Sequence, residues 1–222
     1  MNTGNALLIG RAARARSNGS KGVALAVLAT AQLVIALDYS IVNMALPDIG
    51  RSLGFSGGTV QWVISAYALT FGGLLLLGGR AADLLGRRRM FMAALGLFGV
   101  ASLAGGLTRH GDLLIACRLV QGIGGALLFP ATLSLVNTIF DEGRERTRAI
   151  AVWGSAGASG LSLGVLAGGV LTGLFGWPSV FFVNIPIVRR CWCWRRWCCR
   201  PAAHRRRLGG STCPAPCWSP LQ

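Results

Sequence analysis

Two ionisable residues, Asp38 and Arg118, stand inside long apolar stretches of the chain. A charge at the centre of a bilayer costs at least about 2.5–3.5 kcal/mol, so such a residue normally faces a bundle interior or a water-filled cavity. A carboxyl group in a partly dry cavity has its charged form disfavoured. It could therefore bind and release protons, or pair with a cationic molecule. The alternative is a side chain that snorkels to the membrane surface, which suits Arg118 better than the short side chain of Asp38.

Other polar residues share helix faces with these two. Tyr39 and Asn43 are one helical turn apart and could line the same face. A second face carries residues at i, i+3, i+4 and i+7, which are Arg118, Gln121, Gly122 and Gly125. The glycines here do not form a dinucleotide fingerprint, because they follow no strand and have the wrong spacing.

Apolar segments must position these residues. A bilayer requires about 20 mostly apolar residues per helix, because its core is about 30 Å thick. The segments lack the alternation of barrel strands, so we expect helices and an all-α polytopic membrane protein. The expected spans are Gly22–Leu46, Val60–Gly79, Met90–Leu107, Leu113–Asn137 and Ala149–Phe175, and a sixth starts near Val180 and breaks off at Arg189. Pro47 and Asp48 are expected to end the first, and a basic loop to follow Gly79.

The charge pattern excludes a soluble nucleic-acid binder. Only 13% of the residues are charged, whereas a soluble domain has roughly a quarter. The net charge of +15 is concentrated in short clusters between apolar segments and in the last part of the chain. This distribution is typical of cytoplasmic loops rather than of a nucleic-acid interface.

The basic clusters also predict orientation. With residues 1–21 as a cytoplasmic arm, the inside segments hold eleven basic residues, and the outside loops hold two, Arg51 and Arg109. We therefore expect a multi-pass protein of the inner (plasma) membrane with a cytoplasmic N-terminus. The first apolar segment has no clear cleavage site and is interpreted as a retained helix rather than a signal peptide.

Four ordered motifs resemble those of a known transporter family. They are Leu37–Ile49, Gly79–Arg89, Arg118–Ala126 and Trp177–Pro186. Together they resemble the fourteen-helix drug:proton antiporters of the major facilitator superfamily. The resemblance implies the N-terminal half of a helical bundle, with five full spans and the start of a sixth in residues 22–188. It also implies proton-coupled efflux of a hydrophobic or cationic small molecule, with no cofactor and no metal.

The resemblance implies roles for the motif residues. Asp38 would exchange protons and Arg118 would take part in proton transfer, although Arg118 could instead only bond backbone carbonyls. Tyr39, Asn43 and Gln121 would lie at the same proton and substrate site. A conformational latch would involve Gly79, Asp83, Gly86, Arg87 and Arg88. The alternative for Asp83 and Arg87 is a weak exposed ion pair.

Glycines recur along the fifth span. Small residues at intervals of three or four let two helices approach closely. The glycines assigned to helix packing are Gly157, Gly160, Gly164, Gly168 and Gly169. The segment Gly160–Gly169 also resembles the antiporter motif of this span, although Val165 stands where that motif has proline.

Residues 189–222 have a different composition. They hold six of the seven cysteines, four of the seven tryptophans and eight of the 22 basic residues. A zinc site with His204 is disfavoured by the cysteine spacing, and a lipid-binding basic patch is a second reading. We favour a frameshift. Cys191–Cys199 in GC-rich codons, regrouped one base earlier, reads Val-Leu-Val-Leu-Ala-Ala-Val-Val-Leu, which is an apolar span.

Three functions are weighed. The first is a multidrug efflux antiporter that is truncated here, lacks its C-terminal half and is inactive alone. The second is a membrane scaffold or regulatory subunit that pairs with a full-length transporter. A membrane-bound enzyme ranks last, because no nucleophile–base pair, ligand set or phosphate loop stands in the spans. The expected partners are lipid, protons and the small-molecule substrate.

Overall fold

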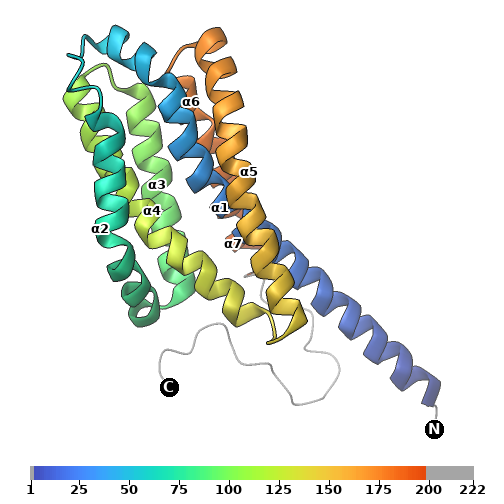
Figure 1. The fold of residues 1–222 in the computed structure, drawn as a ribbon. Helices are drawn as coiled ribbons and strands as arrows, with labels where there is room; N and C mark the ends of the chain where they lie inside the picture. The colour runs from blue at the N-terminus through green and yellow to red at the C-terminus, as the bar shows by residue number, and fades with distance from the viewer. Residues whose placement is uncertain (1–2, 199–222) are drawn as a thin grey trace.

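The computed structural model describes residues 3–198, and side-chain surroundings for residues 21–191. Over this range every regular element is a helix, as the sequence predicted (Figure 1). The elements are α1 (Thr3–Leu53), α2 (Trp62–Leu85), α3 (Arg87–Leu107), α4 (Gly111–Ile139), α5 (Arg144–Phe175), α6 (Ser179–Phe182) and α7 (Asn184–Cys198).

Five of these helices, α1 to α5, are long and apolar enough to cross a membrane. In α1 the spanning part is Lys21–Leu53. The large apolar side chains left exposed, such as Leu76 and Leu166, lie on these helices. A surface of this kind is stable against hydrocarbon and not against water. The protein is therefore a multi-pass membrane protein, as predicted.

The helices pack in two groups that α1 and α4 join. The long helix α5 lies along α1, and both α2 and α3 lie along α4 (Figure 1). The short α6 and the helix α7 pack against α1 and α3. Residues of α1, α4 and α7 therefore meet in the interior, although they are far apart in the sequence.

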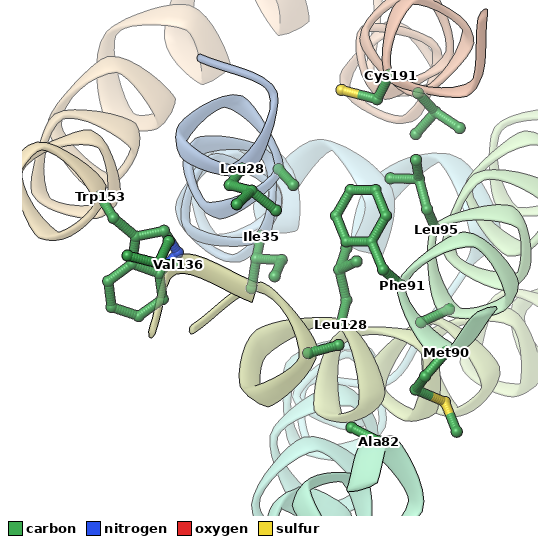
Figure 2. Packing of buried hydrophobic residues seen from close by; sticks show 14 of the residues in the cluster. Leu28, Ile35, Ala82, Met90, Phe91, Leu95, Leu128, Val136, Trp153 and Cys191 are labelled. Atoms are coloured by element: carbon green, nitrogen blue, oxygen red, sulfur yellow. The ribbon is translucent and has the colours of Figure 1, made fainter. Parts of the chain in front are cut away.

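A hydrophobic core holds the bundle together. It collects Leu28 of α1, Phe91 of α3, Leu128 of α4, Trp153 of α5 and Cys191 of α7 (Figure 2). All are buried. Because six helices contribute to this one cluster, it fixes their relative positions and hence the geometry of the polar residues buried beside it.

The structure corrects the predicted end of the second span. The helix α2 does not stop at Gly79 but continues to Leu85, so Asp83 is helical. The expected basic loop shrinks to Gly86, whose φ of 89° only glycine adopts freely. A single glycine suffices as the turn because α3 starts at Arg87.

The first and last spans also differ from the prediction. The helix α1 contains Pro47 and ends only at Leu53, where Gly54 has a φ of 66°. Beyond Pro47 the last turn is supported by Arg51, whose Nη2 donates to Asp48 Oδ1 at 2.6 Å. The sixth segment divides into α6 and α7, and the helix α7 continues past Arg189, where the apolar sequence ends, to Cys198. The segment interpreted as frameshifted is residues 189–222. Most of it, residues 199–222, lies outside the described residues.

Candidate functional site

Asp38 of α1 is fully buried and lies at the centre of a polar cluster. Its Oδ2 accepts a hydrogen bond from Arg118 Nη1 at 2.7 Å. Its Oδ1 accepts from Gln121 Nε2 at 2.6 Å and from Asn184 Nδ2 at 2.7 Å. Both carboxylate oxygens are thus satisfied by groups from α4 and α7, which compensates the loss of water around the charge.

Arg118 is fully buried as well, so it does not snorkel to the membrane surface. Its Nη1 also donates to Gln121 Oε1 at 2.9 Å, and its Nε donates to the carbonyl oxygen of Val63 at 3.1 Å. Its Cζ lies 4.3 Å from the centre of the Tyr67 ring, within the range of a cation–π interaction. Arg118 therefore bonds a backbone carbonyl, as one of the two alternatives expected, and it bonds an acidic side chain as well.

Two glycines of α4 let this arrangement form. A Cβ on Gly122 would lie 2.6 Å from the carbonyl oxygen of Tyr67, and one on Gly125 would lie 3.0 Å from the Tyr67 hydroxyl. These distances are shorter than side chains tolerate. The missing side chains allow α2 to approach α4 closely enough for Val63 and Tyr67 to reach Arg118.

The sequence interpretation did not assign roles to three members of the cluster, Tyr67, Ser102 and Asn184. Asn184 Nδ2 donates to Ser102 Oγ at 3.1 Å, and Ser102 Oγ donates to the carbonyl oxygen of Phe181 at 2.9 Å. Ser102 and Asn184 are fully buried. The available signal was weak, because neutral polar residues in apolar spans are common. Asn184 does, however, fall inside the motif Trp177–Pro186.

Tyr39 and Asn43 lie outside this cluster. Tyr39 is 40% exposed, and Asn43 Nδ2 donates to the backbone carbonyl of Tyr39 at 2.6 Å. The two residues are one turn apart, as expected. They approach the cluster only through the Tyr39 ring, whose centre is 6.2 Å from that of Tyr67.

A row of aromatic rings leads away from Tyr67. Neighbouring ring centres are 5.7 Å apart for Tyr67 and Phe71, 6.1 Å for Phe71 and Phe129, and 5.2 Å for Phe129 and Trp153. The row crosses from α2 over α4 to α5. The row begins beside the buried charge pair, and its two middle rings, Phe71 and Phe129, are only partly buried.

The residues of the expected latch lie together around the turn between α2 and α3. Asp83 Oδ1 lies 3.5 Å from Arg87 Nη2, and both side chains are largely exposed. Arg87 Nη1 also donates to Thr138 Oγ1 at the end of α4. Gly86 forms the turn, Arg88 follows in the first turn of α3, and the nearest contact of a Cβ on Gly79 would be Pro130 Cβ at 3.9 Å.

Four of the five glycines on α5 face α1. A Cβ at Gly157 would lie 3.0 Å from Gln32 Nε2, and Cβ atoms at Gly160, Gly164 and Gly168 would lie within 3.0 Å of α1 backbone oxygens. Gly169 differs, because no atom of the described residues lies within 4 Å of the position of its Cβ. It does not contact α1, and its assignment to helix packing stays a prediction.

The comparisons with known proteins agree with this architecture. The profile of the Major Facilitator Superfamily matches residues 28–194. A puromycin resistance protein, pur8, from Streptomyces alboniger is 48% identical over 73% of this chain and 32% of its own. The cephamycin export protein CmcT of Amycolatopsis lactamdurans is 41% identical over 78% of this chain and 36% of its own. The chain thus spans about a third of the length of these relatives.

A solved structure shares the fold. It is a bacterial homologue of the human lysosomal transporter Spinster in an inward-facing, unoccupied conformation. The TM-score is 0.67 at 18% identity, over 78% of this chain and 42% of that one. The profile covers well over half of the 222 residues, and the charged cluster lies within the matched range. The chain belongs to the major facilitator superfamily.

Proposed function

We propose that this chain forms the N-terminal half of a proton-coupled efflux transporter for hydrophobic or cationic small molecules. The observation that carries the proposal is the fully buried Asp38 carboxylate, paired with an equally buried Arg118 at 2.7 Å. An ion pair inside a membrane span is expensive to maintain and is usually functional. Relatives named for puromycin resistance and cephamycin export support small-molecule efflux.

Protonation of Asp38 would change the forces between helices. A neutral acid no longer balances the charge of Arg118, which keeps only the Gln121 oxygen, the Val63 carbonyl and the face of Tyr67. An uncompensated buried charge destabilises this packing and favours a rearrangement that lets water or an anion reach Arg118. Loading and release of one proton would thereby alternate two arrangements of α1, α2 and α4.

The substrate would use the apolar surface beside this pair. Phe71 and Phe129, the two partly buried rings of the row, would offer their faces to flat apolar molecules and cations. The remaining wall of the path would come from a C-terminal half or from a partner transporter. The Asp83–Arg87 pair would contact that half at the inner side of the plasma membrane, with the N-terminus in the cytoplasm. We do not expect transport from these 222 residues alone.

A complementation experiment tests the proposal. The chain is reconstituted in liposomes alone, and also together with the two thirds of the puromycin resistance protein pur8 that it does not cover. We expect puromycin-dependent proton flux only from the combination, and its loss in Asp38→Asn. Robust flux from the chain alone would disprove the half-transporter assignment. Unchanged flux in the combination carrying Asp38→Asn would disprove the role of Asp38.

A further inference from the structure

The amide nitrogen of the Asn184 side chain makes hydrogen bonds, and its amide oxygen makes none among the described residues. It is fully buried at the start of α7. Its Nδ2 donates to Asp38 Oδ1 at 2.7 Å and to Ser102 Oγ at 3.1 Å. Its Oδ1 has no partner within the described part of the chain. A buried oxygen without a donor is unfavourable, so another interaction must hold the amide in this orientation.

The Asp38 carboxylate is that interaction. If the amide turned over, its oxygen would face Asp38 Oδ1, and two acceptors would meet at hydrogen-bond distance. Protonation of Oδ1 reverses the preference, because the new O–H needs an acceptor and the turned amide supplies one. Each orientation of Asn184 therefore matches one protonation state of Asp38.

Ser102 can adapt to the turned amide by rotating only its hydroxyl group. Its hydroxyl now accepts from Asn184 Nδ2 and donates to the carbonyl oxygen of Phe181. When the amide oxygen takes the place of Nδ2, the hydroxyl can rotate and donate to it instead. The Phe181 carbonyl in α6 then loses the Ser102 donor and keeps only the backbone N–H of Val183. Protonation of Asp38 on α1 thereby changes a hydrogen bond at the junction of α6 and α7.

We propose that Asn184 is a positioning residue for proton exchange at Asp38. Its amide stabilises the carboxylate in one orientation and the protonated acid in the other, and passes the change through Ser102 to α6. The inference rests on the proposed proton coupling and adds the element that responds to it. It also explains why α7 contributes a buried polar residue to the cluster around Asp38.

Few other groups near Asp38 can titrate or carry charge. They are Arg118 on α4, Tyr67 on α2 and Tyr39 on α1 itself. Asn184 of α7 bonds Asp38 directly, and Ser102 of α3 bonds Asn184; neither side chain titrates. The spans of α5 and α6 that face α1 contain no ionisable residue between Ala149 and Phe182.

Carbodiimide labelling tests the inference on the chain itself. Dicyclohexylcarbodiimide reacts with protonated carboxyl groups in apolar surroundings, so the labelling of Asp38, measured by mass spectrometry from pH 5 to 9 in nanodiscs, reports its protonation. In Asn184→Leu the carboxylate loses a charge-assisted bond and the acid loses a weaker neutral one. We expect the labelling midpoint to move to higher pH by about one unit.

Two variants set the comparison. Ser102→Ala keeps the direct bond between Asn184 and Asp38, so a smaller shift is expected. Thr172→Val removes another buried hydroxyl, on α5 and outside the cluster, and should leave the midpoint unchanged. If Asn184→Leu does not give folded protein, Asn184→Ser removes the same amide without adding volume.

The outcomes separate the inference from the proposed function. An unchanged midpoint in both Asn184 variants overturns the role of Asn184 and leaves proton exchange at Asp38 intact. Equal shifts in Thr172→Val or in Ser102→Ala also overturn it, because they would reflect general loosening. Labelling of Asp38 that is independent of pH in the unaltered chain would contradict the proposed function itself.

Discussion

The Asp38–Arg118 pair concentrates the electrostatic cost of this fold at one point. Each charge is fully buried and has hydrogen-bond partners on other helices, and Arg118 Nη2 has none among the described residues. Such a pair adds little net stability compared with apolar residues of the same volume, yet removal of one partner is severe. The low net stability is consistent with the proposed role of the pair in proton exchange.

Removal of Arg118 alone should destabilise the protein strongly. Arg118→Met leaves the Asp38 carboxylate without its counter-charge, and we expect a loss of about 3–5 kcal/mol in the free energy of unfolding. The measurement is denaturation of the purified chain in mixed micelles. In the double variant Asp38→Asn/Arg118→Met at least half of the loss should return. Equal losses in the single and double variants would show that the two residues are not coupled.

The two charged residues of this cluster could be predicted from the sequence, because a charge inside an apolar span has a large energetic cost. Asn184 and Ser102 could not be assigned in the same way. A neutral amide or hydroxyl costs far less to bury, and it becomes part of a site only through contacts with helices distant in the sequence. The fold class was also predictable from the sequence, because five apolar segments that are long enough to span a membrane leave few alternatives to a helical bundle.

At the scale of the elements, the contact between α1 and α5 depends on missing side chains. A Cβ at Gly164 would lie 2.8 Å from both the Leu37 carbonyl oxygen and Ser40 Cβ. At the same contact Ser40 Oγ donates to the carbonyl oxygen of Leu161 at 2.7 Å. The spacing of the glycines predicted a close contact with another helix, but it could not show that Gly169 lies outside the contact with α1. Helix ends were less predictable, because Gly79 and Pro47 are tolerated within the packed helices.

Alanine at two glycines of α5 should have opposite effects. Gly164→Ala forces α1 and α5 apart and is expected to cost about 1–3 kcal/mol. Gly169→Ala meets no atom within 4 Å, and should be neutral or stabilise the helix by up to about 1 kcal/mol. Thermal unfolding in detergent measures both. A comparable loss at Gly169 would contradict the packing explanation, because helix propensity alone favours alanine over glycine at both positions.

Lys21 ties the start of the first span to the segment between α4 and α5. Its Nζ lies 2.9 Å from Asp141 Oδ2 and 3.1 Å from Glu145 Oε2. The hydrogen bond from Lys21 holds the pKa of the exposed Asp141 carboxyl below its ordinary value. The stabilisation is therefore present above about pH 4, the ordinary pKa of aspartate, and is lost as the pH falls through the lowered value.

This tie predicts a difference in acid sensitivity. Between pH 5 and pH 3 the unfolding temperature of the unaltered chain should fall more than that of Lys21→Gln, which lacks the tie at every pH. The difference should be small and should shrink in high salt, because exposed ion pairs are screened. Superimposable pH profiles for the two proteins would argue that Lys21 contributes nothing to stability.

At the scale of the whole molecule, the distribution of charge follows the turns of the bundle. At one end of the bundle, α2 carries Arg80 near its end and the starts of α3 and α5 carry Arg87, Arg88, Arg89, Arg144, Arg146 and Arg148, whereas the opposite end carries Arg51 and Arg109. The matched superfamily profile and the shared fold describe the helices. They do not fix which end faces the cytoplasm, for which the charge bias is the physical argument.

Site-directed labelling should reveal this orientation. In a cysteine-free background, Arg109→Cys in the exposed turn between α3 and α4 should react with an impermeant maleimide in intact cells. Glu142→Cys, exposed between α4 and α5, should react only after permeabilisation. The opposite pattern would place the N-terminus outside the cell and invert the proposed topology.

The distance along the chain between the members of the buried cluster has a consequence for biosynthesis. Asp38 precedes Arg118 by 80 residues and Asn184 by 146. At about 5–20 residues per second, a ribosome needs about 4–16 s to make the arginine after the aspartate. During that interval the first helix carries an acid with neither counter-ion nor amide donor. It must wait protonated, or beside the water-filled insertion channel, until the fourth helix arrives.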